Sequence, residues 1–196
     1  IMTAALSDAV SKYGRSIVIV PNKSLVTQTE KDYINMELDV GVYFGDRKEL
    51  GKTHTICTWQ SLNVLDKKSK NWSLENALTL ADFLDGVRTV IVDEVHMAKA
   101  DALKTLLTGA FAKVPIRWGL TGTIPKAKFE AQSIYVSLGN VIGKLSASEL
   151  QDQGVLAQCH VNIVQLKDDV EFTNYQSELK HLLEDTHRLD AIAQLI

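Results

Sequence analysis

Short apolar segments rich in β-branched residues recur along the 196-residue chain, and they constrain its fold more than any other feature. They do not alternate clearly between apolar and polar residues, so we expect each to be a strand buried on both faces. Helical patterns separate several of them. Buried strands joined by crossover helices predict an α/β fold, a three-layer, doubly wound parallel sheet. The predicted strands are residues 16–20, 40–44, 55–58, 87–92 and 117–120.

The predicted helices of this region follow the 3.6-residue period of apolar side chains. The first has no N-cap in front of it, so we expect the chain to be truncated at its N-terminus. The polar, charged residues 66–72 predict an exposed loop. The predicted helices are residues 1–10, 24–36, 73–84 and 101–111.

The pattern changes after about Gly143, and we expect residues 1–145 to form one domain and residues 146–196 a separate segment. Ser146 and Glu149 have the spacing of a capping box at the start of a short helix. Residues 159–166 alternate like a strand. From residue 171 onward, an apolar stripe predicts one long amphipathic helix with no stop signal.

The composition suits one ordinary domain, since 45% of the residues are hydrophobic. The net charge of −3 produces no global field that attracts nucleic acid, although a local basic groove is enough for a translocating motor. Cys57 and Cys159 have no metal-ligand spacing and are interpreted as buried free thiols. The chain has no long apolar run and no signal peptide, so we expect a cytoplasmic protein without membrane contact.

The strongest chemical signal is the segment VIVDEVH at residues 90–96, in which a buried strand ends in two adjacent carboxylates. Ionised carboxylates there are costly without a cation or hydrogen bonds. A Mg²⁺ ion carrying nucleotide phosphates would balance them, held by Asp93 through its water shell. Glu94 would then orient and deprotonate the attacking water. The alternative is a solvated acidic turn after the strand.

A second strand ends in the segment WGLTGT at residues 118–123, a turn of hydroxyl, glycine and hydroxyl. Gly122 allows the backbone to approach a ligand closely. The hydroxyls of Thr121 and Thr123 can bond to the carboxylates, to phosphate-side groups or to the backbone. Taken alone, this segment is also compatible with an ordinary turn.

Together these segments resemble the motifs of superfamily 2 helicases, in the expected order and each at the end of a predicted strand. DEVH at 93–96 is similar to motif II, the DExH box, and LTGT at 120–123 to motif III. VPNKSLVTQ at 20–28 is similar to motif Ia, and TWQSL at 58–62 to motif Ib or Ic. These motif sequences are most similar to those of the subgroup that includes UvsW-type branch-migration helicases, XPB-like helicases and restriction-enzyme motor subunits.

The resemblance implies that the chain is the first RecA-like motor domain, a P-loop NTPase fold, of such a helicase. ATP and Mg²⁺ are the implied cofactors, with Asp93 as the Mg²⁺ ligand and Glu94 as the catalytic base. Residues 146–196 would lead toward a second RecA-like domain. Coupling between the nucleotide and the nucleic acid is implied for His96, Thr121, Gly122 and Thr123.

The same resemblance implies a path for one nucleic-acid strand, held mainly through its phosphates. Backbone amides, a lysine and small hydroxyls would give a grip that does not depend on sequence. Trp59 is interpreted as packed against the sheet rather than stacked on a base. Lys67, Lys68 and Lys70 either extend the path or lie in a solvated loop. The residues implied to line the path are Pro21, Asn22, Lys23, Thr58, Gln60 and Ser61.

A Walker A loop, GxxxxGK(S/T), is missing from the sequence, although such helicases need it to hold the phosphates. Residues 45–53 come close, but five residues rather than four separate Gly45 from Gly51. A strand pattern follows, whereas a phosphate loop must open a helix. We therefore expect the loop upstream of Ile1, and an isolated fragment with little or no ATPase activity.

The function implied is that of an ATP-dependent DNA helicase or translocase that remodels branched or duplex DNA in recombination, repair or replication. Single-stranded or branched DNA is the expected partner, and RNA remains possible because phosphate contacts do not read the sugar. Two alternatives stay open. One is the DNA-translocating motor subunit of a restriction system, and the other is a nucleic-acid-binding module without ATPase activity.

Overall fold

The structure is a computed structural model that describes residues 1–70, 78–97, 101–125, 127–165 and 170–194. Its contacts divide the chain into two compact units, Ile1–Lys144 and Leu145–Ile196. They are called unit 1 and unit 2 below and are described separately. The boundary lies at residue 144, and the role of the second unit as a passage toward another domain stays a prediction.

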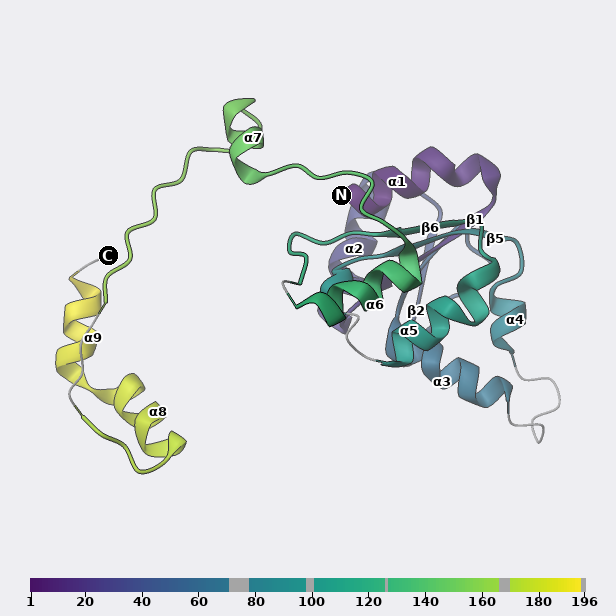
Figure 1. Ribbon diagram of the computed structural model, residues 1–196. Helices are drawn as coiled ribbons and strands as arrows, with labels where there is room; N and C mark the ends of the chain where they lie inside the picture. The colour runs from purple at the N-terminus through teal and green to yellow at the C-terminus, as the bar shows by residue number, and fades with distance from the viewer. Residues whose placement is uncertain (71–77, 98–100, 126, 166–169, 195–196) are drawn as a thin grey trace. The chain divides into compact units, whose positions relative to one another are not determined.

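Unit 1 is built on one sheet in the strand order β3-β2-β4-β1-β5-β6 (Figure 1). Only β3 runs antiparallel, as a short hairpin partner of β2. All other neighbours pair in parallel, with β1 at the centre between β4 and β5. The strands are β1 Arg15–Val20, β2 Val40–Phe44, β3 Arg47–Lys48, β4 His54–Thr58, β5 Val87–Val92 and β6 Ile116–Gly119.

Helices cover both faces of this sheet and make three layers, so the predicted fold class is confirmed (Figure 1). Helices α1 and α2 bury one face, where Val18, Val20 and Ile91 of the strands meet Val26 and Tyr33. The other face packs against α3, α4, α5 and α6. The helices of unit 1 are α1 Met2–Val10, α2 Lys23–Asn35, α3 Trp59–Ser69, α4 Leu80–Phe83, α5 Asp101–Thr108 and α6 Lys128–Leu138, with 3₁₀ turns at Ser11–Tyr13, Val95–Met97 and Ala110–Lys113.

The five predicted strands are all present, each within one residue at either end, but the prediction of an exposed loop from residue 66 is wrong for residues 66–69. The chain is helical through Ser69 in α3, where an exposed loop was expected, and the expected loop's residues 71 and 72 lie outside the described residues. Asp66 and Lys70 form an ion pair of 2.6 Å one turn apart, so the charged run is the solvent face of a helix. The helix predicted over 73–84 begins at Leu80, and its residues 73–77 lie outside the described chain.

A buried polar cluster joins α1 and α2 to the sheet. The Tyr33 hydroxyl lies 2.6 Å from Ser7 Oγ and donates to the carbonyl of Thr3 at 3.1 Å. Ser16 Oγ lies 2.7 Å from Nδ1 of His54 and donates to Ser7 Oγ at 3.3 Å. The tyrosine ring packs edge-on against the His54 ring. Since all five residues are buried, these bonds satisfy groups that water cannot reach.

Unit 2 contains α7 Ala147–Asp152, α8 Tyr175–Glu184 and α9 Thr186–Ala193. The predicted capping box is confirmed, because Ser146 Oγ accepts from the Glu149 amide and Glu149 accepts from the Ser146 amide at 2.7 Å. The prediction of a strand over 159–166 is wrong for 159–165, which form no ladder. Residue 166 lies outside the described chain.

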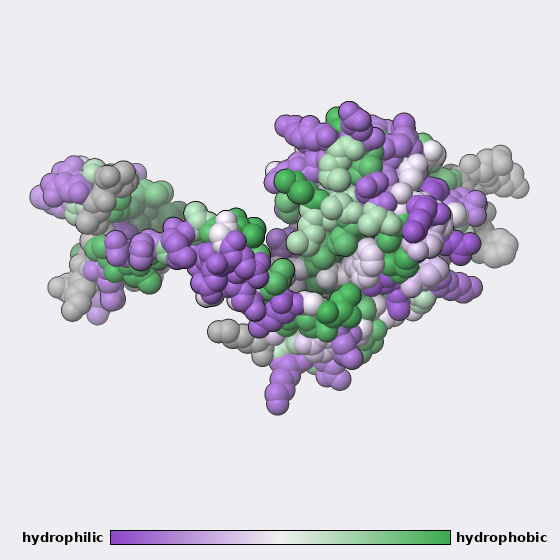
Figure 2. All heavy atoms as spheres, turned by 90° about the horizontal axis from the view of Figure 1, so that it is seen from above, coloured by the Kyte–Doolittle hydropathy of each residue, from purple (hydrophilic) through white to green (hydrophobic). Residues whose placement is uncertain are grey.

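The single long helix predicted from residue 171 is also wrong, since two helices meet at Asp185. The side chain of Asp185 accepts a hydrogen bond from the Arg188 amide at 2.7 Å and caps the second helix. The apolar stripe is thus divided between two short helices, and hydrophobic residues remain exposed on unit 2 (Figure 2).

The interpretation of both cysteines as buried thiols holds for one of them. Cys57 is buried in β4, and burial raises the pKa of its thiol. Cys159 is exposed, because the segment around it does not pair with a sheet. Over the described parts of the chain, no helix has both the length and the apolar character that a membrane span requires.

The buried cluster generates a stability prediction. Tyr33→Phe removes the hydroxyl that bonds to Ser7 and Thr3, and we expect the free energy of unfolding to fall by about 1–2 kcal/mol. Urea denaturation measures the change. Tyr13→Phe is the matched control, since the Tyr13 side chain is exposed and should leave the midpoint unchanged. Equal stability of the two variants contradicts the structural role of the cluster.

The same substitution has a pH signature. Burial raises the pKa of Tyr33 from 10.0 to about 12. The folded state therefore holds the phenol proton more tightly than the unfolded state. The stabilisation from this raised pKa is complete below pH 10 and is lost as the pH rises toward 12. Between these values, we expect the wild type to lose stability more steeply than Tyr33→Phe.

Candidate functional site

The carboxyl ends of four parallel strands lie together at one edge of the sheet. Val20 of β1 pairs with Thr58 of β4, and Ile19 pairs with Val92 of β5. Val92 pairs in turn with Gly119 of β6. The segments resembling motifs Ia, Ib, II and III each begin where one of these strands ends. The sheet therefore brings the four predicted segments to the edge where open α/β sheets bind ligands.

Backbone hydrogen bonds hold the DExH segment in place as it leaves β5. The Asp93 amide donates to the Ile19 carbonyl at 2.9 Å, and the Val95 amide donates to the Leu120 carbonyl at 2.9 Å. The Glu94 amide donates to Oδ1 of Asp93 at 3.0 Å. Glu94 itself has a φ of 49°, in the left-handed region that residues with a side chain rarely adopt. Such backbone strain is concentrated at functional sites.

His96 links the two strand ends through its side chain. Its Nδ1 atom lies 2.8 Å from Oγ1 of Thr121 and 3.2 Å from Oε2 of Glu94. Thr121 Oγ1 donates to the Thr123 carbonyl at 2.9 Å and accepts from the Thr123 amide at 3.1 Å. Because the hydroxyl proton of Thr121 goes to that carbonyl, Nδ1 of His96 must carry the proton it shares with Thr121 and Glu94.

This geometry decides how the threonine turn is used. The sequence left three kinds of partner open for the Thr121 hydroxyl: the carboxylates, phosphate-side groups and the backbone. In the structure this hydroxyl bonds to the backbone of Thr123, and His96 lies between it and the carboxylate of Glu94. Gly122 is exposed, and a Cβ atom built on it meets no heavy atom within 4 Å. The structure thus connects Glu94, His96, Thr121 and Thr123 in one chain of contacts and leaves Gly122 outside it.

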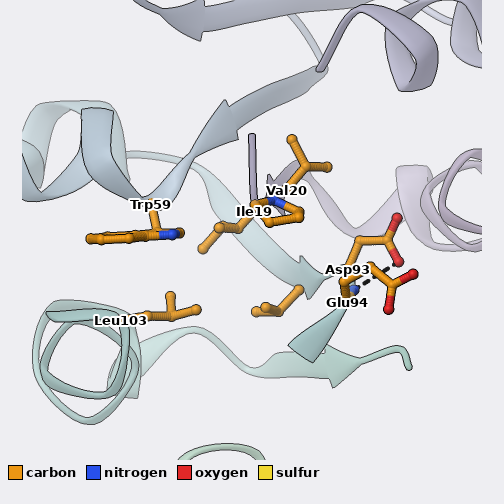
Figure 3. Close-up of a pocket in the computed structure, with 8 residues that line it drawn as sticks. Ile19, Val20, Trp59, Asp93, Glu94 and Leu103 are labelled. Atoms are coloured by element: carbon orange, nitrogen blue, oxygen red, sulfur yellow. Dashed lines mark hydrogen bonds between the residues drawn. The ribbon is translucent and has the colours of Figure 1, made fainter. Parts of the chain in front are cut away.

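An apolar pocket opens beside the two carboxylates. Asp93 and Glu94 lie at one end of it, and Trp59 of α3 and Leu103 of α5 lie toward the other (Figure 3). Trp59 is half-buried against the hydrophobic core, which confirms that it packs on the sheet. The complete lining is Ile19, Val20, Pro21, Trp59, Val92, Asp93, Glu94 and Leu103.

The six residues proposed for the nucleic-acid path gather around the ends of β1 and β4. Asn22 caps α2, since its Oδ1 accepts from the Leu25 amide at 3.0 Å. Thr58 caps α3 and also bonds to Ser61. Gln60 donates to the Pro21 carbonyl at 3.4 Å and joins the two motifs.

These contacts give Asn22 and Thr58 structural tasks that the sequence did not predict. The missed signal was the spacing of a capping residue three positions before the amide it accepts from, which both segments contain. Lys23, at the first position of α2, remains exposed beside the ring of Phe44, 5.9 Å from its centre. Lys67 and Lys68 lie in the last turn of α3.

The site fits a Mg²⁺ ion held partly by phosphates better than a metal held by protein alone. In the described residues, no group of three or more histidine, cysteine or acidic side chains could hold a metal. Asp93 and Glu94 are both half-buried, at a strand end. Mg²⁺ keeps several waters and needs only one or two carboxylates when nucleotide phosphates supply other ligands.

The near match to a phosphate loop at residues 45–53 serves another purpose. Gly45 forms the turn between β2 and β3, and strand β4 rather than a helix follows Thr53. Lys52 Nζ donates to Asp39 at 2.8 Å, and the Thr53 amide donates to the same carboxylate at 2.9 Å. The strand predicted to follow this segment is therefore confirmed, where a phosphate loop would open a helix.

Comparison with known families decides the identity of this arrangement. A sequence profile of the family described as "Type III restriction enzyme, res subunit" (ResIII) matches residues 1–126. The chain belongs to this family. Its unit 1 is a RecA-like domain of the superfamily 2 helicase type, as the resemblance of the motifs implied.

Known relatives of this ResIII-family chain include the ATP-dependent DNA helicase uvsW of Enterobacteria phage T4, 22% identical over 197 residues. That match covers 93% of the chain and 36% of the helicase, so the chain spans about a third of this relative's length. Two crystal structures of the T4 UvsW helicase are similar to it, with TM-scores of 0.55 and 0.52 at 16% and 17% identity. Each match covers 70% of the chain, and 48% and 27% of the solved chains respectively. At this level of identity the structures establish the fold alone.

The contacts of Asp39 generate a pH prediction. The hydrogen bonds from Lys52 and Thr53 lower the pKa of Asp39 to about 2. The contribution of this carboxylate to the free energy of unfolding is fully present above pH 4 and is lost as the pH falls toward 2. In Lys52→Ala, we expect the pKa of Asp39 to rise toward 3.8 and the acid-dependent loss to shrink.

A carboxyl-detected NMR titration measures this pKa directly. Lys12→Ala is the matched control, because Lys12 packs on Tyr13 and makes no contact with Asp39. An unchanged pKa of Asp39 in Lys52→Ala contradicts the structural role of the segment at 45–53.

Proposed function

We propose that the full-length protein is an ATP-dependent DNA helicase or translocase, and that this chain provides its hydrolytic carboxylates and part of its strand path. One observation carries the proposal. The acidic pair at the end of β5 is linked through His96 to the threonine turn at the end of β6. Family membership and the likeness to the T4 ATP-dependent DNA helicase support the same reading.

Asp93 and Glu94 have different tasks in this proposal. Asp93 holds Mg²⁺ through its water shell, and the ion when bound neutralises the charge of the nucleotide phosphates. Glu94 orients the attacking water and accepts its proton. The left-handed conformation of Glu94 and its contact with His96 support this task, because they fix where its carboxylate points. ATP binding also requires a loop of the GxxxxGK(S/T) kind, which these 196 residues do not contain.

The coupling residues connect hydrolysis to movement. His96 contacts both the carboxylate of Glu94 and the hydroxyl of Thr121, so a change in the charge near Glu94 alters the hydrogen bonding of the threonine turn. We place Thr121, Gly122 and Thr123 between the nucleotide and the nucleic acid. In this scheme ATP closes a cleft between two motor domains, and hydrolysis reopens it.

The DNA path runs over the ends of β1 and β4 and contacts mainly phosphates. Lys23 supplies charge, and the hydrogen bond from Gln60 to Pro21 fixes the distance between the two segments. Single-stranded or branched DNA is the proposed partner, in recombination, repair or replication, and the likeness to a DNA helicase supports DNA as the partner. RNA remains an alternative. The proposed contacts are Pro21, Asn22, Lys23, Thr58, Gln60 and Ser61.

A second candidate is the DNA-translocating motor of a restriction system, which the description of the matching family favours. The two candidates differ in the DNA that stimulates ATP hydrolysis. A branch-remodelling helicase responds most to forked or four-way DNA, whereas a restriction motor responds to long duplex that carries its recognition site. Measuring hydrolysis with single-stranded, duplex and forked DNA and with RNA separates them. An absence of hydrolysis with every nucleic acid favours a binding module instead.

Glu94→Gln tests the catalytic proposal. Glutamine keeps the size of the side chain but accepts no proton, so we expect ATP turnover of the full-length protein to fall at least ~100-fold while nucleotide binding is retained. Glu37→Gln is the matched control, since Glu37 also has a positive φ, of 57°, but lies at the exposed end of α2. Substantial hydrolysis by Glu94→Gln removes Glu94 from the catalytic role.

Thr121→Val tests the coupling proposal. Valine has the shape of threonine but cannot bond to Nδ1 of His96, which lies 2.8 Å from the hydroxyl. We expect the stimulation of hydrolysis by DNA to fall about tenfold, with hydrolysis in the absence of DNA changed less. Thr121→Ser keeps the hydroxyl and should retain the stimulation. If both variants are stimulated like the wild type, this contact does not carry the coupling.

A further inference from the structure

The exposed face of α2 carries a stripe of hydrogen-bond donors that extends well beyond Lys23. The stripe repeats every three or four residues, so its members lie on one side of the helix. All are exposed, and together they line one open concavity on the surface of unit 1. The members of the stripe are Lys23, Ser24, Thr27, Gln28 and Lys31.

The acidic residues of α2 do not neutralise this stripe. Glu30 lies on one flank, and its carboxylate is bound by both terminal nitrogens of Arg47 at 2.9 and 2.7 Å. Asp32 lies on the other flank and is half-buried. Neither Lys23 nor Lys31 forms an ion pair with these acids in the described part of the chain, so both ammonium groups remain available to an external anion.

Most donors of the stripe have no hydrogen-bond partner within the described part of the chain. Ser24, Gln28 and Lys31 make no side-chain hydrogen bond or ion pair there, and Thr27 bonds weakly to the carbonyl of Lys23 at 3.4 Å. Lys23 and Lys31 are eight residues apart, which is about 12 Å along a helix. One strand of a duplex advances by about 3.4 Å per phosphate, so this length matches three or four phosphates.

We propose that this face of α2, the phosphate track, binds the sugar–phosphate backbone of a DNA strand over three or four nucleotides. The proposal rests on the proposed function and extends the strand path from Lys23 along the helix to Lys31. Two ammonium groups, two hydroxyls and an amide at regular spacing suit a row of phosphates. Contacts to phosphates carry no sequence information, so the track grips DNA of any sequence.

The salt dependence of DNA binding tests the track. In the full-length protein, Lys31→Ala removes one cation from an exposed helix position where alanine is well tolerated. We expect the dissociation constant to rise roughly three- to tenfold for DNA of any sequence. The slope of log K against log salt should become shallower by about 0.9 for duplex and about 0.7 for single-stranded DNA. Fluorescence anisotropy at several salt concentrations measures both quantities.

Matched variants separate charge from other effects. Lys31→Arg keeps the charge and should restore the slope. Gln28→Ala should weaken binding without changing the slope, because glutamine releases no counterion. Lys113→Ala removes an exposed lysine outside α2, from the 3₁₀ turn that precedes β6, and should change neither the affinity nor the slope.

The outcomes distinguish the track from the function on which it rests. If the wild type binds DNA and Lys31→Ala keeps its affinity and slope, the track is wrong and the proposed function stands. A wild type that binds neither single-stranded nor duplex DNA overturns the proposed function first, and the track with it. If an acidic polypeptide such as polyglutamate binds the wild type more tightly than DNA does, the track is a protein-docking surface and the proposal fails.

Discussion

The parallel pairing of β1 on both of its edges is the constraint on which the rest of unit 1 depends. β1 bonds to β4 on one side and to β5 on the other, in registers that pair Val20 with Thr58 and Ile19 with Val92. Three of the four motif segments follow these strands, and the threonine turn follows β6, which pairs with β5. A slip in a parallel ladder would move an acidic pair or a threonine turn away from its partner and reverse which side chains face the core.

This dependence explains how much the sequence could predict. Strand order and motif position are encoded locally, because each buried strand is a short β-branched run and each motif follows such a run directly. The five strands and the edge where the motifs meet were therefore predictable. Helix α3 was not, because its solvent face is so charged that the period of Leu62 and Leu65 was obscured. The break at Asp185 was not predicted, because the apolar stripe continues past it and favours one helix, whereas the N-cap that starts a second helix is a single residue.

Within the candidate site, residue types were predictable and their connections were not. The sequence indicates a carboxylate pair and a threonine turn but cannot show that one histidine nitrogen contacts both, since the two segments are 25 residues apart. Nor does it show that Gln60 reaches the Pro21 carbonyl. Such contacts depend on the register between strands, which no single segment contains. The same holds for the stripe on α2, since its flanking acid Glu30 is occupied by an arginine from β3.

The conformation of Glu94 shows how the sheet supports the chemistry. A left-handed residue with a side chain costs about 1–2 kcal/mol, so an isolated acidic turn would relax into an ordinary conformation. Here the backbone amides on either side of Glu94 are already hydrogen-bonded. The Asp93 amide donates to the Ile19 carbonyl of β1, and the Val95 amide donates to the Leu120 carbonyl after β6. Each bond reaches a different neighbouring strand, so relaxing Glu94 would break a contact with one of them. The strain at the carboxylate is therefore offset by the pairing of β1, β5 and β6, and the position of Glu94 beside His96 depends on all three strands remaining in register.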